Sequence, residues 1–126
     1  MYGYKKIVNL PYTQAVEKTK EELQKESFGV LTEIDVKATL KKKLDVDFDN
    51  YIILGACNPP NAFKALQAEQ DIGLMLPCNV IVYEKKGKTV VSAVKPTIAM
   101  GMIDNEKLKG IAMEIEAKLK KVVDNV

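Results

Sequence analysis

The two cysteines, Cys57 and Cys78, are the side chains best suited to chemistry. Each is followed by an asparagine (Asn58 and Asn79), each has a proline within two residues, and each lies at one end of an apolar segment. Two thiols that converge can bind a soft or borderline metal, hold a small ligand together with asparagine amides, or alternate between dithiol and disulfide. We therefore predict a binding site made of Cys57, Asn58, Cys78 and Asn79, in which the two cysteines are the candidate metal ligands.

The spacing of the cysteines leaves other interpretations open. Cys78 follows Cys57 by 21 positions, which matches neither a Cys-x-x-Cys pair nor a four-ligand zinc set. Two ligands do not close a tetrahedral site unless a second subunit or other residues contribute. Free cysteine is also a common buried residue, and the neighbouring prolines and asparagines are typical of turns. The alternative function is a structural or protein-interaction module with inert, buried cysteines.

The residue types that the chain lacks exclude several kinds of catalytic and metal site. The chain has no histidine, and all 19 basic residues are lysine. Without histidine, Ser-His-Asp and Cys-His arrangements within one chain are excluded, as are histidine-ligated zinc and iron sites. A cysteine nucleophile would need lysine or a carboxylate as its base, and the sequence indicates none. Whether the protein is an enzyme stays open, and no cofactor is indicated.

The low net charge argues against nucleic acid as a partner, and the short apolar stretches argue against a membrane span. The net charge is only +2, and there is no arginine to read guanine edges or phosphates. The lysines of residues 37–43 are followed at once by Asp45, Asp47 and Asp49, so a solvated helix face is the better interpretation. No apolar stretch approaches the roughly 18–20 residues of a membrane span, and the first residues lack a signal-peptide core. We expect a cytoplasmic protein, where thiols are usually reduced.

Local patterns predict the elements that position the cysteines. Residues 51–57 are nearly all apolar, which predicts a strand covered on both faces and ending at Cys57. Asn58-Pro59-Pro60 favours a helix start, whose amide N–H groups and positive dipole end would favour a thiolate at Cys57. Cys78 begins a strand over 78–84, followed by a hairpin with Gly87 at positive φ and a return strand over 89–94. If the two cysteine strands are neighbours, both sulfurs meet at one edge of the sheet.

The remaining patterns complete a single domain over residues 1–126. They predict strands over 4–10 and 28–34 and helices over 13–26, 36–44 and 105–123, the last capped by Asp104. Gly29 is expected in the turn after the first helix, 71–73 form a turn, and 96–103 form an apolar connector. The result is an α+β fold with an antiparallel or mixed sheet of about five strands and helices mainly on one face.

Four stretches of the chain form a recognisable set: Gly55-Ala56-Cys57-Asn58-Pro59, Gly73-Leu74-Met75-Leu76-Pro77-Cys78-Asn79-Val80, Phe28-Gly29-Val30-Leu31 and Ile34-Asp35-Val36. In these stretches the chain resembles domain-of-unknown-function family 302. The resemblance implies a TATA-binding-protein-like β-α-β(4)-α fold and a homodimer. It implies no activity, and a shared architecture with a DNA-binding protein transfers no function. The residue patterns add two short helices to that order, at 36–44 and after Asn58.

Overall fold

Five strands form one antiparallel sheet in the order β1-β5-β4-β3-β2. The computed structural model describes residues 1–126. Its elements are β1 (Gly3–Val8), α1 (Tyr12–Lys25), β2 (Gly29–Asp35), α2 (Val36–Leu44), β3 (Tyr51–Cys57), α3 (Pro59–Ala68), the 3₁₀ helix η1 (Gln70–Met75), β4 (Cys78–Lys85), β5 (Lys88–Val94), α4 (Pro96–Ala99) and α5 (Glu106–Asp124). The α+β fold with an antiparallel sheet of five strands is confirmed, as are the two short helices added to the β-α-β(4)-α order.

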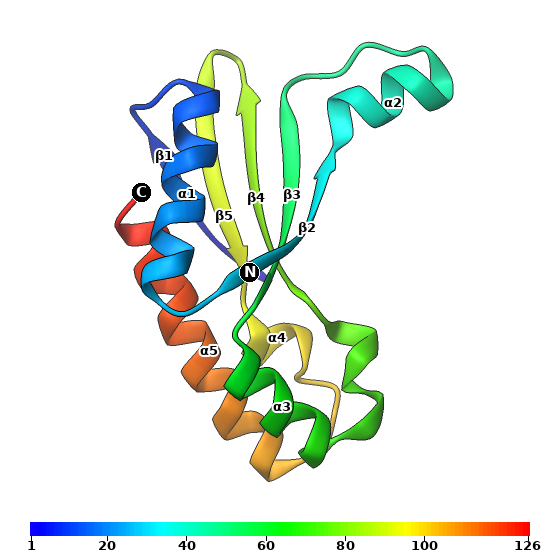
Figure 1. The fold of residues 1–126 in the computed structure, drawn as a ribbon, viewed down its shortest axis with the longest axis vertical. Helices are drawn as coiled ribbons and strands as arrows, with labels where there is room; N and C mark the ends of the chain where they lie inside the picture. Colours follow the sequence, from blue (N-terminus) through cyan, green and yellow to red (C-terminus); the bar gives the residue numbers. More distant parts are fainter.

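Helices α1 and α5 cover one face of the sheet (Figure 1). Strand side chains alternate between the two faces, so one set of alternate residues meets these helices. That set forms the main core with Leu23 of α1 and Leu119 and Val122 of α5, and it includes Leu54, Val80, Val82, Val91 and Ala93. Burying each large apolar side chain contributes about 1.5–3 kcal/mol. The covered face therefore supplies most of the stability of the fold.

The opposite face of the sheet is not covered by α1 or α5. Ile7 of β1 and Ile34 of β2 carry side chains of this face and remain 58% and 47% exposed. Between them, Tyr51 of β3 and Tyr83 of β4 are paired across the strands, and their rings stack with centroids 5.3 Å apart. An apolar, partly aromatic surface is thus left open on this side.

A second, smaller core fixes α3 against α5 beyond the end of the sheet (Figure 1). It is made of Ala65, Ile72, Met100, Leu108 and Ala112. Ile72 lies in η1, which replaces the simple turn predicted at 71–73, and Met100 follows α4, which forms within the predicted connector. A turn alone would leave the Ile72 side chain without the packing that it has here. This second core sets the position of α3.

Two predictions of local geometry are wrong. The cap of α5 is Asn105, whose Oδ1 accepts from the Leu108 N–H at 3.2 Å, and not Asp104. Asn105 Nδ2 also donates to the Ala68 carbonyl at 2.7 Å, a bond that an aspartate cannot make. After α1, the residue with positive φ is Ser27 at 66°, whereas Gly29 lies within β2. Gly87 has the predicted positive φ, at 77°.

Helix α2, which follows the edge strand β2, projects from the body as an arm (Figure 1). β2 is an edge strand whose register shifts between Val30 and Thr32, and α2 has no buried residue. Asp35 caps α2 as predicted, by accepting from the Ala38 N–H at 3.0 Å. The lysines of α2 lie on its solvent-exposed surface, where Lys41 pairs with Asp45 at 3.0 Å. An exposed pair of this kind contributes at most about 1 kcal/mol.

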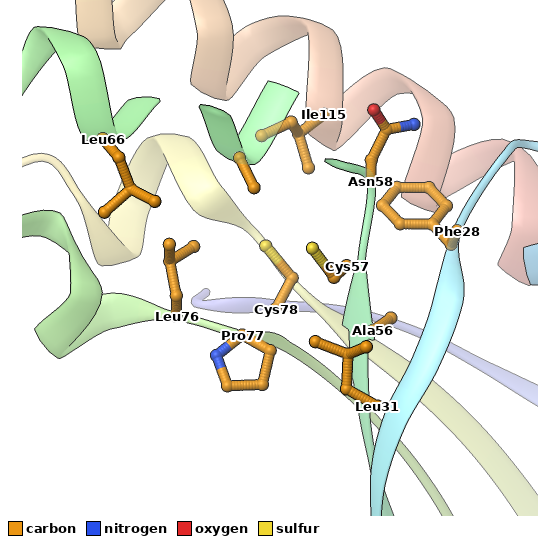
Figure 2. A pocket seen from close by; sticks show the side chains of 11 residues that line it. Phe28, Leu31, Ala56, Cys57, Asn58, Leu66, Leu76, Pro77, Cys78 and Ile115 are labelled. Carbon is orange, nitrogen blue, oxygen red and sulfur yellow. The ribbon is translucent and has the colours of Figure 1, made fainter. Parts of the chain in front are cut away.

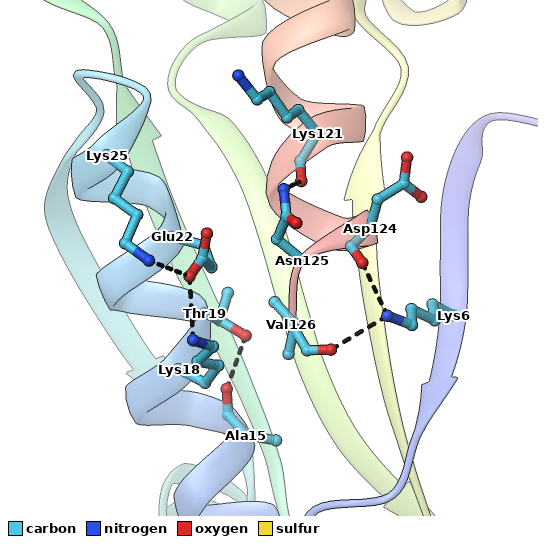
Figure 3. Close-up of polar contacts among 10 residues, drawn as sticks. All are labelled: Lys6, Ala15, Lys18, Thr19, Glu22, Lys25, Lys121, Asp124, Asn125 and Val126. Atoms are coloured by element: carbon cyan, nitrogen blue, oxygen red, sulfur yellow. Dashed lines mark hydrogen bonds and ion pairs between the residues drawn. The ribbon is translucent and has the colours of Figure 1, made fainter.

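Polar contacts tie the end of α5 to the sheet and join side chains within α1 (Figure 3). Lys6 Nζ of β1 donates to the carbonyls of Asp124 and Val126 at 2.9 and 3.1 Å, which fixes the end of α5 beside the edge strand. On α1, the Glu22 carboxylate lies 2.8 Å from Lys25 Nζ and 3.2 Å from Lys18 Nζ. None of the helices combines the length and the apolar character needed to cross a membrane.

Candidate functional site

Strands β3 and β4 are neighbours, and Cys57 and Cys78 lie at the same end of the sheet. Ala56 and Cys78 are directly paired across the strands, so Cys57 lies one residue beyond the partner of Cys78. Figure 2 shows both sulfur atoms directed into one space, with Leu66 and Leu76 on one side and Phe28 on the other. Both cysteines are free thiols, Cys78 buried and Cys57 half-buried.

This space is a cavity of about 270 Å³ at the end of the sheet. Its walls come from the end of β3, the start of β4, the first half of β2, α3 and the middle of α5. Nine of the eleven lining residues are apolar, and the full set is Phe28, Leu31, Ala56, Cys57, Asn58, Ala62, Leu66, Leu76, Pro77, Cys78 and Ile115. Leu31 and Leu66 are 66% and 39% exposed and form the rim.

Asn58 positions the wall of the cavity through its own hydrogen bonds. Its Oδ1 accepts from the Asn61 N–H at 3.3 Å and thereby caps α3, and its Nδ2 donates to the Glu26 carbonyl at 3.3 Å. Asn58 thus joins the end of α1 to the start of α3. Because both ends of the amide already have a partner in the protein, Asn58 lines the cavity as a structural residue.

The start of α3 does not supply the amide donors that the sequence suggested for a Cys57 thiolate. Pro59 and Pro60 have no N–H group. The next two N–H groups are used, since Asn61 donates to the Asn58 side chain and Ala62 donates to the Asn58 carbonyl at 2.9 Å. The same prolines that favour a helix start therefore remove the donors that an anion would need.

Asn79 is the one predicted site residue that the structure places elsewhere. It follows Cys78 in β4, is paired with Gly55 and is exposed. Successive strand residues point to opposite faces, so Asn79 lies away from the face that Cys78 occupies. The cavity therefore brings together Cys57, Asn58 and Cys78.

Cys78 is a neutral thiol at neutral pH. Burial, together with the nearby Cys57, raises the pKa of Cys78 to about 11. An unperturbed cysteine has a pKa near 8.5, so the Cys78 thiolate is strongly disfavoured here. The side chain acts in this setting as a small, polarisable, uncharged group.

The metal hypothesis has only the two sulfurs as its ligands. No group of three or more histidine, cysteine, aspartate or glutamate side chains is arranged to hold a metal ion. A tetrahedral ion at Cys57 and Cys78 would therefore need donors from another molecule. The geometry suits an uncharged ligand better than an ion.

Sequence reasoning missed most of the cavity wall. Phe28, Leu31, Leu66 and Ile115 come from segments far apart in the chain, and each one fits an ordinary apolar position of its own strand or helix. The glycine at position 55 was a usable signal, since a Cβ there would lie 2.8 Å from Pro77 Cγ and would also collide with the Thr32 side chain. Glycine lets β2, β3 and the segment before β4 approach closely next to the site.

These observations define a small α+β protein with a thiol-containing apolar cavity at the end of a five-stranded antiparallel sheet. The family model described as "Domain of unknown function DUF302" matches residues 4–126, and the chain belongs to this family. The resemblance found in the sequence is therefore confirmed.

A solved relative has the same fold. The chain is similar to the crystal structure of the uncharacterized conserved protein DUF302 from Bacillus stearothermophilus, with 35% sequence identity and a TM-score of 0.94. The similarity covers 99% of this chain and 98% of the other. No curated protein matches the chain. The comparisons thus establish the family and the fold and assign no specific function.

Proposed function

We propose that this protein binds a small, uncharged, apolar molecule in the cavity that contains Cys57 and Cys78. The observation that carries the proposal is the wall of the cavity, which is almost entirely apolar. A ligand that replaces water there gains about 25 cal/mol for each Å² of apolar surface buried. Cys57, Cys78 and Asn58 form the centre of the proposed site, with the thiols as contacts and Asn58 as a support.

The hydrogen bonding around the cavity favours a ligand without charge. Both ends of the Asn58 amide are occupied, and no buried side-chain nitrogen or oxygen lacks a partner. A charged or strongly polar ligand would lose its hydration without gaining a matching partner. Cys78 is protonated, so it offers no ready anion to a metal ion.

The size of the cavity favours a compact ligand. About 270 Å³ is close to the lower end of the usual range for ligand pockets, roughly 300–1,000 Å³. Short hydrocarbon chains and small aromatic rings fit this class. The exposed rim residues Leu31 and Leu66 supply a route in from the solvent that is itself apolar.

Titration with the uncharged fluorescent probe N-phenyl-1-naphthylamine tests the proposal. The chain has no tryptophan, so probe fluorescence is read against a low protein background. Ala62→Phe places a ring inside the cavity and is expected to weaken probe binding at least tenfold. Ala117→Phe adds the same ring at an exposed position of α5 and is the matched control.

The result that would overturn the proposal is equal probe binding by wild type and Ala62→Phe when circular dichroism shows both to be folded. Leu66→Trp at the exposed rim is a second blocking variant if Ala62→Phe does not fold. Wild-type protein that binds no probe at all would also count against the ligand function.

A second function, as a module that pairs with another copy of itself, is favoured by the uncovered face of the sheet. Ile7 and Ile34 lie at opposite edges of this face, with the stacked Tyr51 and Tyr83 between them. A twofold axis lets one patch serve both subunits.

Sedimentation equilibrium tests the homodimer. We expect a mass of about twice 14.0 kDa for the wild type and a monomer for Ile7→Lys and Ile34→Lys. Ile98→Lys changes an isoleucine of similar exposure on α4, outside this face, and should stay dimeric. A monomeric wild type, or dimers in all three variants, would refute this assembly. We also propose the cytoplasm as the location, because a reducing compartment keeps both thiols free.

A further inference from the structure

We propose that Cys57 and Cys78 form a reversible disulfide that excludes the ligand from the cavity, so that the ligand and the disulfide compete for the same space. This inference rests on the proposed function, because it adds regulation to the same site. It requires that the thiols can reach each other, that an oxidant can reach one of them, and that the bond changes the cavity.

The strand pairing places the cysteines within bonding range. Cys57 is one residue beyond the partner of Cys78, so strand spacing of about 5 Å and a rise of about 3.4 Å per residue put their Cα atoms about 6 Å apart. Disulfides span Cα separations of about 4.4–6.8 Å. Residues offset by one position usually point to opposite faces of a sheet. Cys57 ends its strand, however, and its sulfur points into the cavity beside that of Cys78 (Figure 2).

The two thiols differ in solvent exposure, and this difference determines which cysteine reacts first. Cys57 is half-buried and Cys78 is buried. Hydrogen peroxide is small and uncharged and can enter an apolar cavity, where it meets Cys57 first. The Cys57 sulfur attacks one peroxide oxygen, the O–O bond breaks, and the products are a sulfenic acid at Cys57 and one water, which leaves with the thiol proton.

Cys78 then completes the bond. Its sulfur attacks the Cys57 sulfur, the S–O bond breaks, and the hydroxyl group leaves with the Cys78 proton as a second water. In sum, two thiols and one hydrogen peroxide give one disulfide and two waters. The thiols lose two electrons and the peroxide gains them. A thiol reductant reverses the bond by exchange.

The bond and the ligand cannot share the cavity. Both sulfurs border the space that the ligand would fill, so a ligand between them holds them apart and a bond between them narrows that space (Figure 2). The bond also constrains Asn58, which caps α3 and thereby positions Ala62 and Leu66 in the wall. Thermodynamic linkage makes the effect reciprocal. The disulfide lowers the affinity for the ligand by the same factor by which bound ligand lowers the equilibrium constant for forming the disulfide.

The experiment uses purified, folded protein treated with hydrogen peroxide. Peptide mapping without reductant should recover a linked peptide that contains Cys57 and Cys78, lighter by two hydrogens than the separate peptides. The oxidised protein should bind N-phenyl-1-naphthylamine at least tenfold more weakly than the reduced protein. Dithiothreitol should restore binding, which separates the disulfide from oxidation of the five methionines. Saturating probe should slow formation of the linked peptide.

Single variants provide the controls. Cys78→Ser should accumulate a Cys57 sulfenic acid that dimedone traps, and Cys57→Ser should form no bridge. Neither variant should lose probe affinity reversibly on oxidation. Absence of the linked peptide in the wild type, or a linked protein that binds the probe as well as before, would overturn the inference. If the disulfide forms but the reduced protein never binds the probe, the proposed ligand function is overturned. The proposal that the disulfide controls ligand binding is then overturned as well.

Discussion

Replacing Asn105 with alanine should destabilise the protein more than any other single change of a helix cap. Asn105 Oδ1 accepts from the Leu108 N–H, and Nδ2 donates to the Ala68 carbonyl at 2.7 Å and to Glu69 Oε1 at 3.1 Å. Loss of an N-cap costs about 1 kcal/mol, and loss of a partly buried hydrogen bond costs a further 0.5–1.5 kcal/mol, approximately. The expected loss for Asn105→Ala is therefore about 1.5–2.5 kcal/mol.

Urea unfolding followed by circular dichroism measures this loss. Asp104→Ala is the matched control, since Asp104 is the cap that the sequence suggested and makes no capping bond in the structure; its effect should stay within about 0.5 kcal/mol. Asn105→Asp keeps the cap acceptor and loses the donor. Its loss of stability should therefore lie between those of Asp104→Ala and Asn105→Ala. Because Asn105 joins α5 to the end of α3, Asn105→Ala should also weaken probe binding in the cavity.

Equal destabilisation by Asn105→Ala and Asp104→Ala would refute the reasoning. So would an Asn105→Asp variant as unstable as the alanine variant, because the cap and the donor would then not be separable.

The remaining predictions concern backbone space and pH. Gly55→Ala should cost more than about 2 kcal/mol in urea unfolding, since its Cβ would lie 2.8 Å from Pro77 Cγ. Gly110→Ala, at an exposed position of α5 with nothing within 4 Å of the new Cβ, should instead stabilise the protein by about 0.5–1 kcal/mol. A stable Gly55→Ala protein would contradict the close approach of β2, β3 and the Pro77 segment. The Glu22 pKa is lowered by hydrogen bonding from Lys25, with Lys18 adding to the effect against the cost of burial. Its contribution is therefore present above the unfolded pKa near 4.3 and is lost as the pH falls through the lower, folded pKa. Wild type should exceed Glu22→Gln in stability at pH 7, and the difference should shrink in acid; a constant difference from pH 7 to pH 2 would contradict this account.

The sequence predicts the elements well because each depends on local chemistry. The spacing of Leu108, Ile115 and Leu119 predicts α5, and Gly87 predicts the hairpin between β4 and β5. Asn105 and Asp104 are both good cap residues by type. The choice between them depends on the Ala68 carbonyl, which lies 37 positions away in the chain. Local propensity carries no information about a partner at that distance.

The cavity was harder to predict than the strands that form it. The paired cysteines are visible in the sequence, but the wall depends on how Leu31 at a register shift and Leu66 on α3 meet around them. Asn79 lies away from the cavity for a simpler reason. It follows Cys78 as Asn58 follows Cys57, yet Asn58 leaves its strand to cap a helix and Asn79 continues along its strand. Similar motifs therefore have different geometry once the backbone differs.

The site has no charged side chain in its wall, and both the local backbone and the amino-acid composition contribute to this. The turn from β3 into α3 uses Asn58, Pro59 and Pro60, and this combination satisfies or removes the first N–H groups of the helix. The chain has no histidine or arginine to replace them. With Cys78 held as a neutral thiol, the end of the sheet becomes an apolar cavity whose reactive groups are two sulfurs. Such a site fits the uncharged ligand and the two-electron oxidant that we propose for it.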